Sequence, residues 1–192
     1  MNITAIIGRC EREMTGVKRL ARLGAAIGLG IVSVLIPSGT AAASYGPYEI
    51  ISNLSHLCVD TVNGSMDDNA PIQQWWCWNG PPQRWTMVFV KTAYRPQTGD
   101  TAFFRLENQK SGKCLDVPSG NPTAGVKVQQ WRCWDGDMQL WSVVTQNQTG
   151  TVQIRNLATD LCLDDTDWSN TPGNRLQQWP CNDMAPQQWY LL

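Results

Sequence analysis

An aspartate and a tryptophan recur at one fixed spacing in three places along the 192-residue sequence. In each place the acid ends a Cys-x-Asp motif, and the tryptophan follows 15 residues later in a Gln-Gln-Trp-x-Cys motif. A carboxylate accepts short, strong hydrogen bonds from hydroxyl groups, and the face of an aromatic ring packs against C–H groups. A sugar offers both kinds of surface, so these residue types suit a carbohydrate ligand. The pairs are Asp60 and Trp75, Asp116 and Trp131, and Asp164 and Trp179.

The same three places share further residues, and these define an internal repeat. A glutamine precedes each tryptophan by two positions, and a Gln-x-Trp motif follows. Every marker moves by 56 residues from the first copy to the second and by 48 from the second to the third, which predicts repeats at about 48–92, 101–145 and 150–192. A unit of this length cannot bury its apolar face alone. The added residues are Gln73, Gln129 and Gln177, then Gln83, Gln139 and Gln187, each of the last three two positions before Trp85, Trp141 or Trp189.

Short apolar segments separated by turn residues every 8–12 positions predict four strands in each repeat. Twelve strands in three units favour an all-β fold with pseudo-threefold symmetry, a β-trefoil, because a propeller typically needs at least four blades. The eight extra residues of the first period fall between Trp85 and Phe103. The expected strands are 48–52, 57–62, 72–77, 85–90, 103–106, 114–117, 126–133, 140–144, 152–155, 161–164, 175–181 and 188–192.

Residues 1–43 are expected to be a secretory signal peptide. Five basic residues precede an apolar run at 23–36, and Ala41-Ala42-Ala43 fits the small-residue cleavage rule. A membrane anchor is the alternative, but this run of 14 residues is shorter than the roughly 20 that a spanning helix needs. Met14 is an alternative start that would give a signal of more ordinary length. Residues 44–192 are therefore predicted to be secreted and extracellular, as one lectin-like domain.

Six of the seven cysteines lie in residues 44–192, and Cys10 lies in the predicted signal peptide. An even number of cysteines in an exported chain implies disulfides, and the repeat favours pairing within each copy, where the two cysteines are 19 positions apart. A zinc site is the alternative, but the chain has no Cys-x-x-Cys and only one histidine, His56, so no metal and no cofactor are expected. The predicted pairs are Cys58–Cys77, Cys114–Cys133 and Cys162–Cys181.

The composition argues against several classes of partner and against catalysis. The net charge is −1 and basic residues do not cluster in the repeats, so neither nucleic acid nor a polybasic membrane contact is expected. Ten tryptophans against three phenylalanines favour some tryptophan at a surface. Glycoside hydrolysis needs two carboxylates on either side of one bond, but neighbours in a strand face opposite sides. The adjacent acids Asp67-Asp68 and Asp164-Asp165 are therefore interpreted as solvated loop acids and not as a catalytic pair. A monomer that is not an enzyme is expected, with a small glycosidase as the weaker alternative.

These motifs together resemble the ricin B-type lectin family, also called family 13 carbohydrate-binding modules, over residues 48–192. The resemblance implies a β-trefoil with one disulfide and up to one shallow sugar-binding site in each repeat. It implies that the acids at 60, 116 and 164 bind sugar, that Trp75, Trp131 and Trp179 are stacking platforms, and that Gln73, Gln129 and Gln177 lie beside them. It further implies that Gln83, Gln139 and Gln187 orient the acids and that Trp85, Trp141 and Trp189 belong to the core.

One position departs from the family pattern in all three repeats. The family usually has Asn just before the last Gln-x-Trp, whereas this chain has Pro82, Met138 and Pro186, which cannot supply that side-chain hydrogen bond. The nearby polar residues Asn79, Asp135 and Asn182 are candidate substitutes, and Trp78 and Trp134 could extend an aromatic surface. The third repeat is expected to be the most intact, with Asp164, Gln177, Trp179 and Asn182.

The sequence leaves two functions open. The first is a free-standing secreted protein that binds a glycan or polysaccharide. The second is a β-trefoil that has lost sugar binding and binds protein, as an inhibitor or a toxin-associated subunit, because an Asp in a repeat can also serve only to stabilise a turn.

Overall fold

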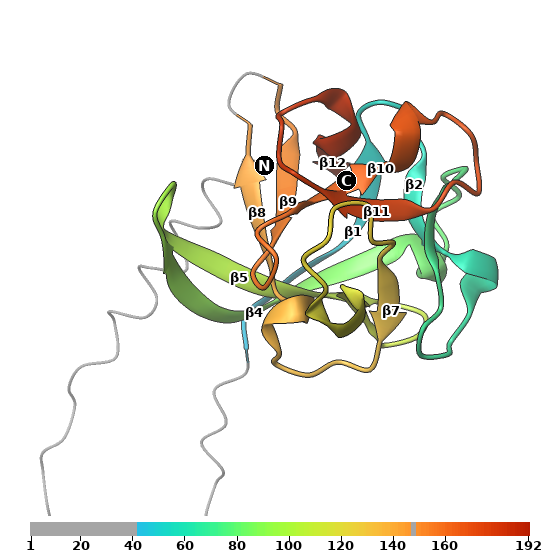
Figure 1. Cartoon of the computed structure of the whole chain (residues 1–192). Coiled ribbons are helices and arrows are strands. Elements are labelled where there is room, and N and C mark those ends of the chain that lie inside the picture. The colour runs from blue at the N-terminus through green and yellow to red at the C-terminus, as the bar shows by residue number, and fades with distance from the viewer. Residues whose placement is uncertain (1–41, 147–148) are drawn as a thin grey trace, which may run out of the picture. The chain divides into compact units, whose positions relative to one another are not determined.

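The computed structural model describes residues 42–146 and 149–192, which lie in one compact unit, Ala42–Leu192. Apart from Ala42 and Ala43, the predicted signal peptide lies outside the described residues, and its cleavage remains a prediction. The described residues form twelve strands, with short 3-10 turns between some of them (Figure 1). The strands are β1 (Ser44–Ser52), β2 (Cys58–Thr61), β3 (Ile72–Trp75), β4 (Arg84–Arg95), β5 (Gly99–Asn108), β6 (Cys114–Asp116), β7 (Gln129–Trp131), β8 (Trp141–Thr145), β9 (Val152–Asn156), β10 (Cys162–Asp165), β11 (Leu176–Trp179) and β12 (Trp189–Leu191). The turns are η1 (Val62–Gly64), η2 (Pro81–Gln83), η3 (Pro118–Gly120), η4 (Asp137–Gln139), η5 (Thr166–Trp168) and η6 (Ala185–Gln187).

Six of these strands close into a barrel. Strand β1 pairs with β4, β4 with β5, β5 with β8, β8 with β9, β9 with β12, and β12 returns to β1, all antiparallel. Each repeat contributes its first and last strand to this ring, so no repeat can form the barrel alone. The barrel is the structural reason that three incomplete units share one core.

The remaining six strands form three hairpins, one for each repeat: β2–β3, β6–β7 and β10–β11. They approach one another through isolated bridges that join Pro71 to Gln129, Lys127 to Gln177, and Arg175 to Gln73. Each hairpin therefore contacts the next, which gives the pseudo-threefold arrangement of a β-trefoil. The predicted fold class is confirmed.

The three tryptophans of the last Gln-x-Trp motifs fill the core, as predicted. Trp85, Trp141 and Trp189 are at most 1% exposed. Each indole N–H donates to a backbone carbonyl of its own hairpin, that of Val59, Leu115 or Leu163, at 3.0–3.2 Å. These bonds satisfy the polar atom that a buried tryptophan carries and attach each hairpin to the barrel beneath it.

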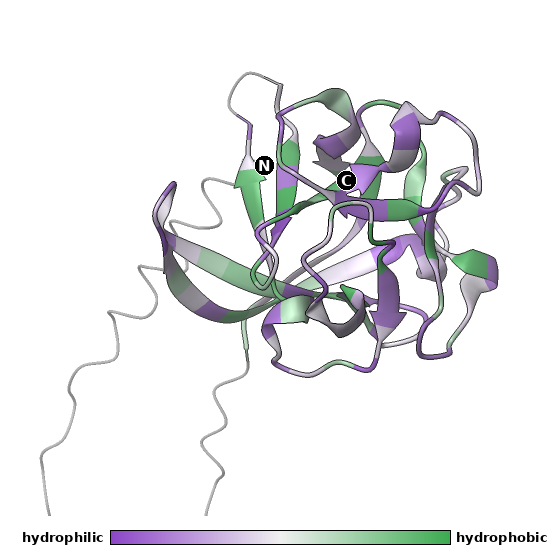
Figure 2. Ribbon diagram, in the orientation of Figure 1, coloured by the Kyte–Doolittle hydropathy of each residue, from purple (hydrophilic) through white to green (hydrophobic). Residues whose placement is uncertain are grey.

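The eight extra residues of the first period lengthen one hairpin. Strands β4 and β5 stay paired from Trp85 and Asn108 out to Arg95 and Gly99, so β4 extends five residues beyond the predicted end at residue 90. Figure 1 shows this hairpin reaching past the rest of the barrel, and Figure 2 shows its tip to be hydrophilic. A paired hairpin satisfies the backbone N–H and C=O groups of the insertion, which an open loop would leave to water.

Strands β3, β7 and β11 end at the tryptophan, two residues before the predicted ends at the cysteines. The difference arises from a side chain. After each tryptophan, a backbone carbonyl accepts from a glutamine Nε2 at 2.9–3.1 Å, so the chain leaves the strand and is held by that amide instead. The three donors are Gln83, Gln139 and Gln187.

The cysteines form the three disulfides that the spacing predicted, Cys58–Cys77, Cys114–Cys133 and Cys162–Cys181. Each joins the first residue of a hairpin strand to the loop that leaves the hairpin. In the chain-entropy account, each bridge over about twenty residues stabilises the fold by roughly 3 kcal/mol. Within the residues that the structure describes, no helix is long and apolar enough to cross a membrane.

Candidate functional site

The three aspartates of the Cys-x-Asp motifs lie in β2, β6 and β10, each opposite a glutamine of the partner strand. The register pairs Asp60 with Gln73, Asp116 with Gln129, and Asp164 with Gln177. In every pair the glutamine Nε2 donates to the carboxylate, at 2.7, 2.7 and 2.8 Å respectively. Cross-strand pairing therefore fixes the position of each acid.

A second amide holds the other side of the carboxylate. Gln139 donates to Asp116 Oδ2 and Gln187 to Asp164 Oδ2, both at 3.1 Å, and Gln83 stabilises the charged form of Asp60 in the same way. Within the described chain, no backbone N–H of turns η1, η3 or η5 donates to these acids. The acids are therefore held by side-chain amides and not by backbone N–H groups of the turns.

Burial raises the pKa of Asp60, Asp116 and Asp164 above the ordinary value, and the glutamine hydrogen bonds oppose that rise. The three side chains are only 3–6% exposed. A carboxylate desolvated in this way retains acceptor capacity that its two amide bonds do not use, since each oxygen has two lone pairs. Such a carboxylate is suited to accept further hydrogen bonds from a ligand that supplies hydroxyl donors.

A tryptophan follows each of these glutamines on the same face of its hairpin. Trp75 and Trp179 are 40% and 42% exposed, whereas Trp131 is half-buried. Residues two apart in a strand share a face, so the ring, the amide and the acid form one cluster. We name the first cluster Asp60, Gln73 and Trp75; the second cluster Asp116, Gln129 and Trp131; and the third cluster Asp164, Gln177 and Trp179.

Each cluster is bordered by a loop from a different repeat. Gly173 N donates to Gln74 O at 2.8 Å, and a Cβ placed on this glycine would lie 3.5 Å from Trp75 Cζ3 and 3.9 Å from Gln73 Oε1. Gly125 occupies the same place beside Trp179 and Gln177. The first and third clusters are therefore completed by a glycine that leaves the ring edge uncovered.

The second cluster is bordered by Asn69, with Asp68 before it. Asn69 N donates to Gln130 O at 3.0 Å, so the backbone arrangement is the same. Asp68, however, accepts from Lys113 Nζ at 2.7 Å and from Arg132 N at 2.9 Å. The Arg132 guanidinium lies over the Trp131 ring, 5.8 Å from its centroid, so a side chain of the protein already occupies part of that face.

The third cluster contains a cation that the sequence analysis did not single out. Lys127 Nζ donates to Gln177 Oε1 at 3.0 Å and to Thr166 Oγ1 at 2.6 Å, and its charge favours the ionised form of Asp164. Burial lowers the pKa of this lysine. The signal in the sequence was positional: Pro71 and Arg175 stand at the places equivalent to Lys127 in the first and third repeats. Lys127 belongs to the second repeat and lies beside Gln177, so among the three clusters the third receives a lysine ammonium group from its neighbour.

The polar residues proposed as substitutes for the absent Asn bond elsewhere. Asn182 Oδ1 accepts from Met184 N at 3.0 Å, Asn79 Oδ1 from Arg84, and Asp135 from Arg105. These bonds stabilise the loops that carry the three residues. The side chain of Asn182 therefore has a local partner, and its backbone N–H donates to Gln187 Oε1 at 2.9 Å, the glutamine that holds Asp164.

Trp78 and Trp134 form exposed aromatic surfaces outside the clusters. Each ring lies directly on a glycine two residues later, Gly80 or Gly136, where an added Cβ would come within 2.1 or 2.4 Å of the indole. The third repeat has Asn182 and Met184 at these two places. The Trp-x-Gly pattern thus belongs to the first two repeats only.

One interpretation from the sequence was wrong. Asp164 and Asp165 are not solvated loop acids, because both lie in β10 and both are buried. They do face opposite ways: Asp164 bonds Gln177 and Gln187, whereas Asp165 Oδ2 accepts from Ser52 Oγ at 3.3 Å. Asp67, by contrast, is an exposed loop residue as expected.

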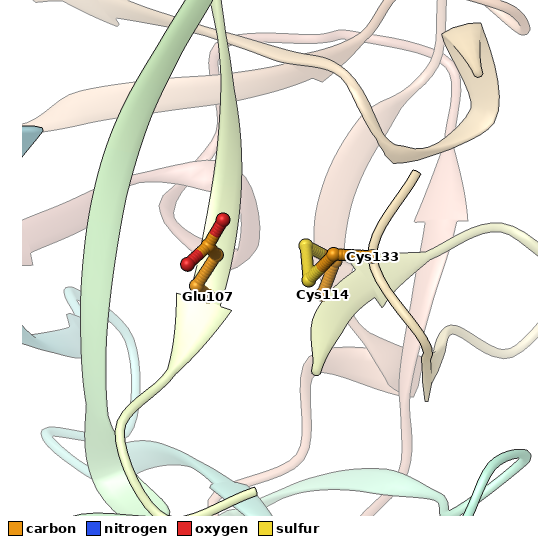
Figure 3. Close-up of side chains that lie close together, drawn as sticks. All are labelled: Glu107, Cys114 and Cys133. Atoms are coloured by element: carbon orange, nitrogen blue, oxygen red, sulfur yellow. A yellow bond between two sulfur atoms is a disulfide. The ribbon is translucent and has the colours of Figure 1, made fainter. Parts of the chain in front are cut away.

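Glu107, Cys114 and Cys133 lie within 4.8 Å of one another (Figure 3). Both sulfur atoms belong to one disulfide, and Glu107 pairs with Arg105 at 3.0 Å. A disulfide offers no thiolate, so this group does not have the chemistry of a metal site.

A comparison with protein-family models matches the sequence to "Ricin-type beta-trefoil lectin domain-like" over residues 36–131, 92–179 and 137–192. The three matches overlap and together span residues 36–192, which include all three repeats. A search of curated proteins found no match.

Solved structures share the fold. A designed threefold-symmetric protein, ThreeFoil, has a TM-score of 0.66 and 27% identity over 76% of this chain and 96% of its own. An exo-beta-1,3-galactanase from Clostridium thermocellum has a TM-score of 0.68 and 27% identity over 76% of this chain, but only 29% of the enzyme is covered. The Rhizoctonia solani agglutinin has a TM-score of 0.62 over 88% of this chain and 99% of its own, and its 17% identity shows the fold alone.

Proposed function

The chain belongs to the ricin-type β-trefoil lectin domain-like family, and from this premise we propose that it is a secreted, monomeric protein that binds glycans or polysaccharide without catalysis. Binding takes place at the Asp–Gln–Trp clusters, through hydroxyl groups on the carboxylate and the C–H face of the sugar on the ring. The first and third clusters carry this activity, because their tryptophans are the open ones.

The observation that supports this most is the way each aspartate is held. In the third cluster, Gln177 and Gln187 bond opposite oxygens of Asp164, so the carboxylate cannot turn away from its exposed edge. The ring of Trp179 lies on the same hairpin face and is 42% exposed. An acceptor and an apolar platform thus stay fixed beside each other without a ligand, which lowers the entropy lost on binding.

Three disulfides support secretion, because such bonds persist in oxidising compartments. The predicted signal peptide at residues 1–43 points the same way. Binding without catalysis is supported by the buried acids: Asp164 and Asp165 face opposite sides of β10, whereas glycoside hydrolysis needs two carboxyl groups flanking one bond. The galactanase is matched over 29% of its length, so its activity is not transferred to this chain.

The test is a glycan and polysaccharide screen with residues 44–192, disulfides intact, followed by calorimetry on the best ligand. Trp179→Ala and Trp75→Ala should each weaken binding while circular dichroism and thermal unfolding stay close to the parent. Binding by the parent to no glycan would overturn the proposal and favour the protein-partner alternative. Unchanged binding in a Trp75→Ala, Trp179→Ala double variant would show that the clusters are not the site.

A further inference from the structure

The three turns that follow the aspartate strands share one unusual backbone. In each turn, two successive residues have positive φ: Asn63 and Gly64 at 54° and 57°, and Ser119 and Gly120 at 55° and 61°. A turn of this kind favours glycine at its second left-handed position, because any other residue brings its Cβ too close to the backbone. The third turn departs from this rule, since Asp167 is followed by Trp168, at φ values of 58° and 55°.

The side chain of Trp168 makes few contacts that could offset this backbone strain. Its side chain is 57% exposed. Within the described residues, its indole takes part in no hydrogen bond and no ring contact, whereas the core tryptophans donate to backbone carbonyls. Backbone strain that packing does not offset points to a role in binding.

Trp168 lies in η5, directly after the strand that carries Asp164. A Cβ placed on Gly64 would lie 3.1 Å from Pro82 Cγ, and one on Gly120 would lie 3.4 Å from Met138 Cε. Pro186 is the equivalent residue in the third repeat, and it is followed by Gln187, which holds Asp164. By the pseudo-threefold equivalence of the repeats, the Cβ of Trp168 is expected near Pro186 of η6, next to the glutamine that holds Asp164.

The two tryptophans lie at opposite ends of this hairpin relative to Asp164. Trp179 is level with Cys162, two residues before Asp164, whereas Trp168 lies in the turn four residues after it. At about 3.3 Å per residue along the strand, Trp179 is set roughly 7 Å from the level of Asp164, about the width of one sugar ring. One sugar unit can therefore occupy the space between Asp164 and Trp179 while the next unit in a chain extends over Trp168.

We propose that Trp168 is a second aromatic contact of the third cluster, and that this cluster takes two or more consecutive units of a glycan chain. In the first and second repeats the equivalent residue is Gly64 or Gly120, so these clusters have no aromatic side chain in the turn after the acid. The inference rests on the proposed sugar binding and specifies the ligand class of one site.

The test compares Trp168→Gly with its parent in an Asp60→Asn, Asp116→Asn background, in which only the third cluster keeps its acid. We expect affinity for an oligosaccharide of the best ligand to fall at least about fivefold, as for loss of one ring contact, and affinity for the matching monosaccharide to stay within twofold. The melting temperature should rise, because glycine relieves the strain. Trp134→Ala, which removes another exposed tryptophan, should leave both affinities unchanged.

The outcomes separate the two proposals. If the parent background binds oligosaccharide and Trp168→Gly binds it equally well, the second contact is wrong while sugar binding stands. A lower melting temperature in Trp168→Gly would identify Trp168 as a structural residue and would also overturn the inference. If neither protein binds any sugar, whereas the chain with all three acids does, the third cluster is not a site; binding by none of them overturns the proposed function itself.

Discussion

The first and third clusters leave their tryptophan faces open, whereas the second cluster covers part of its own. The hairpins are nearly the same: each aspartate accepts from its cross-strand glutamine at 2.7–2.8 Å. Part of the difference comes from the neighbouring repeat, which supplies Gly173 or Gly125 to the open clusters and Asp68 with Asn69 to the covered one. The other part is Arg132 of the second repeat itself, whose guanidinium lies over the Trp131 ring and whose backbone N–H donates to Asp68. The repeat thus preserves the acid and its amides, while the bordering loop and the residue after the tryptophan differ between the clusters.

The largest expected effect separates core tryptophans from cluster tryptophans. Trp189→Ala should lower the free energy of unfolding by roughly 3–5 kcal/mol, because it removes a fully buried indole. Trp179→Ala and Trp131→Ala should each cost far less. Denaturant unfolding monitored by circular dichroism would measure all three. A loss in Trp179→Ala as large as that in Trp189→Ala would mean that the third cluster is a structural feature.

The second and third clusters can be compared by the same substitution at their equivalent aspartates, Asp116 and Asp164. Asp164→Asn and Asp116→Asn should destabilise the protein alike, by about 1 kcal/mol, because each amide can accept from only one of its two glutamines. Affinity should fall at least about tenfold at the third cluster with Asp164→Asn, since a charge-assisted bond is lost. Titration calorimetry should find little change with Asp116→Asn. Equal losses of affinity would show that the covered cluster binds as well.

Asp165 distinguishes the third repeat from the others, which have Thr61 and Val117 at this place. Burial raises the pKa of Asp165 to about 7, and among the described residues its Oδ1 has no hydrogen-bond partner. The folded protein therefore binds a proton that an unfolded Asp releases near pH 4. The free energy of unfolding should decrease as pH rises from about 4 to about 7 and level off above that.

Asp165→Thr provides the check on this pH dependence. The variant should lose part of the slope between pH 4 and 7 and be more stable than the parent at pH 8, by about 1–3 kcal/mol for removal of an unsatisfied buried group. Thermal unfolding across that pH range would measure both effects. An identical slope in the two proteins would assign the dependence to the cluster acids, whose pKa values are raised as well.

The smallest expected effect comes from a substitution that uncovers the Trp131 ring and so makes the second cluster resemble the other two. Arg132→Ala removes the guanidinium from the Trp131 ring, a contact of about 0.5–1 kcal/mol at an exposed site. If that coverage limits the cluster, affinity in an Asp60→Asn, Asp164→Asn background should rise by a small factor, about three- to fivefold. Arg155→Ala, which removes an arginine that pairs with Asp160, is the matched control. No gain in Arg132→Ala would mean that the loop of Asp68 and Asn69 blocks the ligand.

The sequence by itself determined the parts of the molecule that repeat. Twelve strands, the pairing of cysteines 19 positions apart and the burial of Trp85, Trp141 and Trp189 follow from motifs that recur at constant spacing, because equivalent positions in a symmetric barrel share one environment. The position of each aspartate opposite its glutamine follows from the same register.

Only the tertiary structure decided what differs between the repeats. Asp68 and Arg132 are 64 positions apart, Lys127 and Gln177 are 50 apart, and Ser52 and Asp165 are 113 apart, so local pattern could not bring them together. The strain at Trp168 was also hidden, because a tryptophan in a turn becomes costly only when the backbone there is left-handed. Contacts between repeats are set by how three hairpins meet on one barrel, and that arrangement fixes which clusters are open.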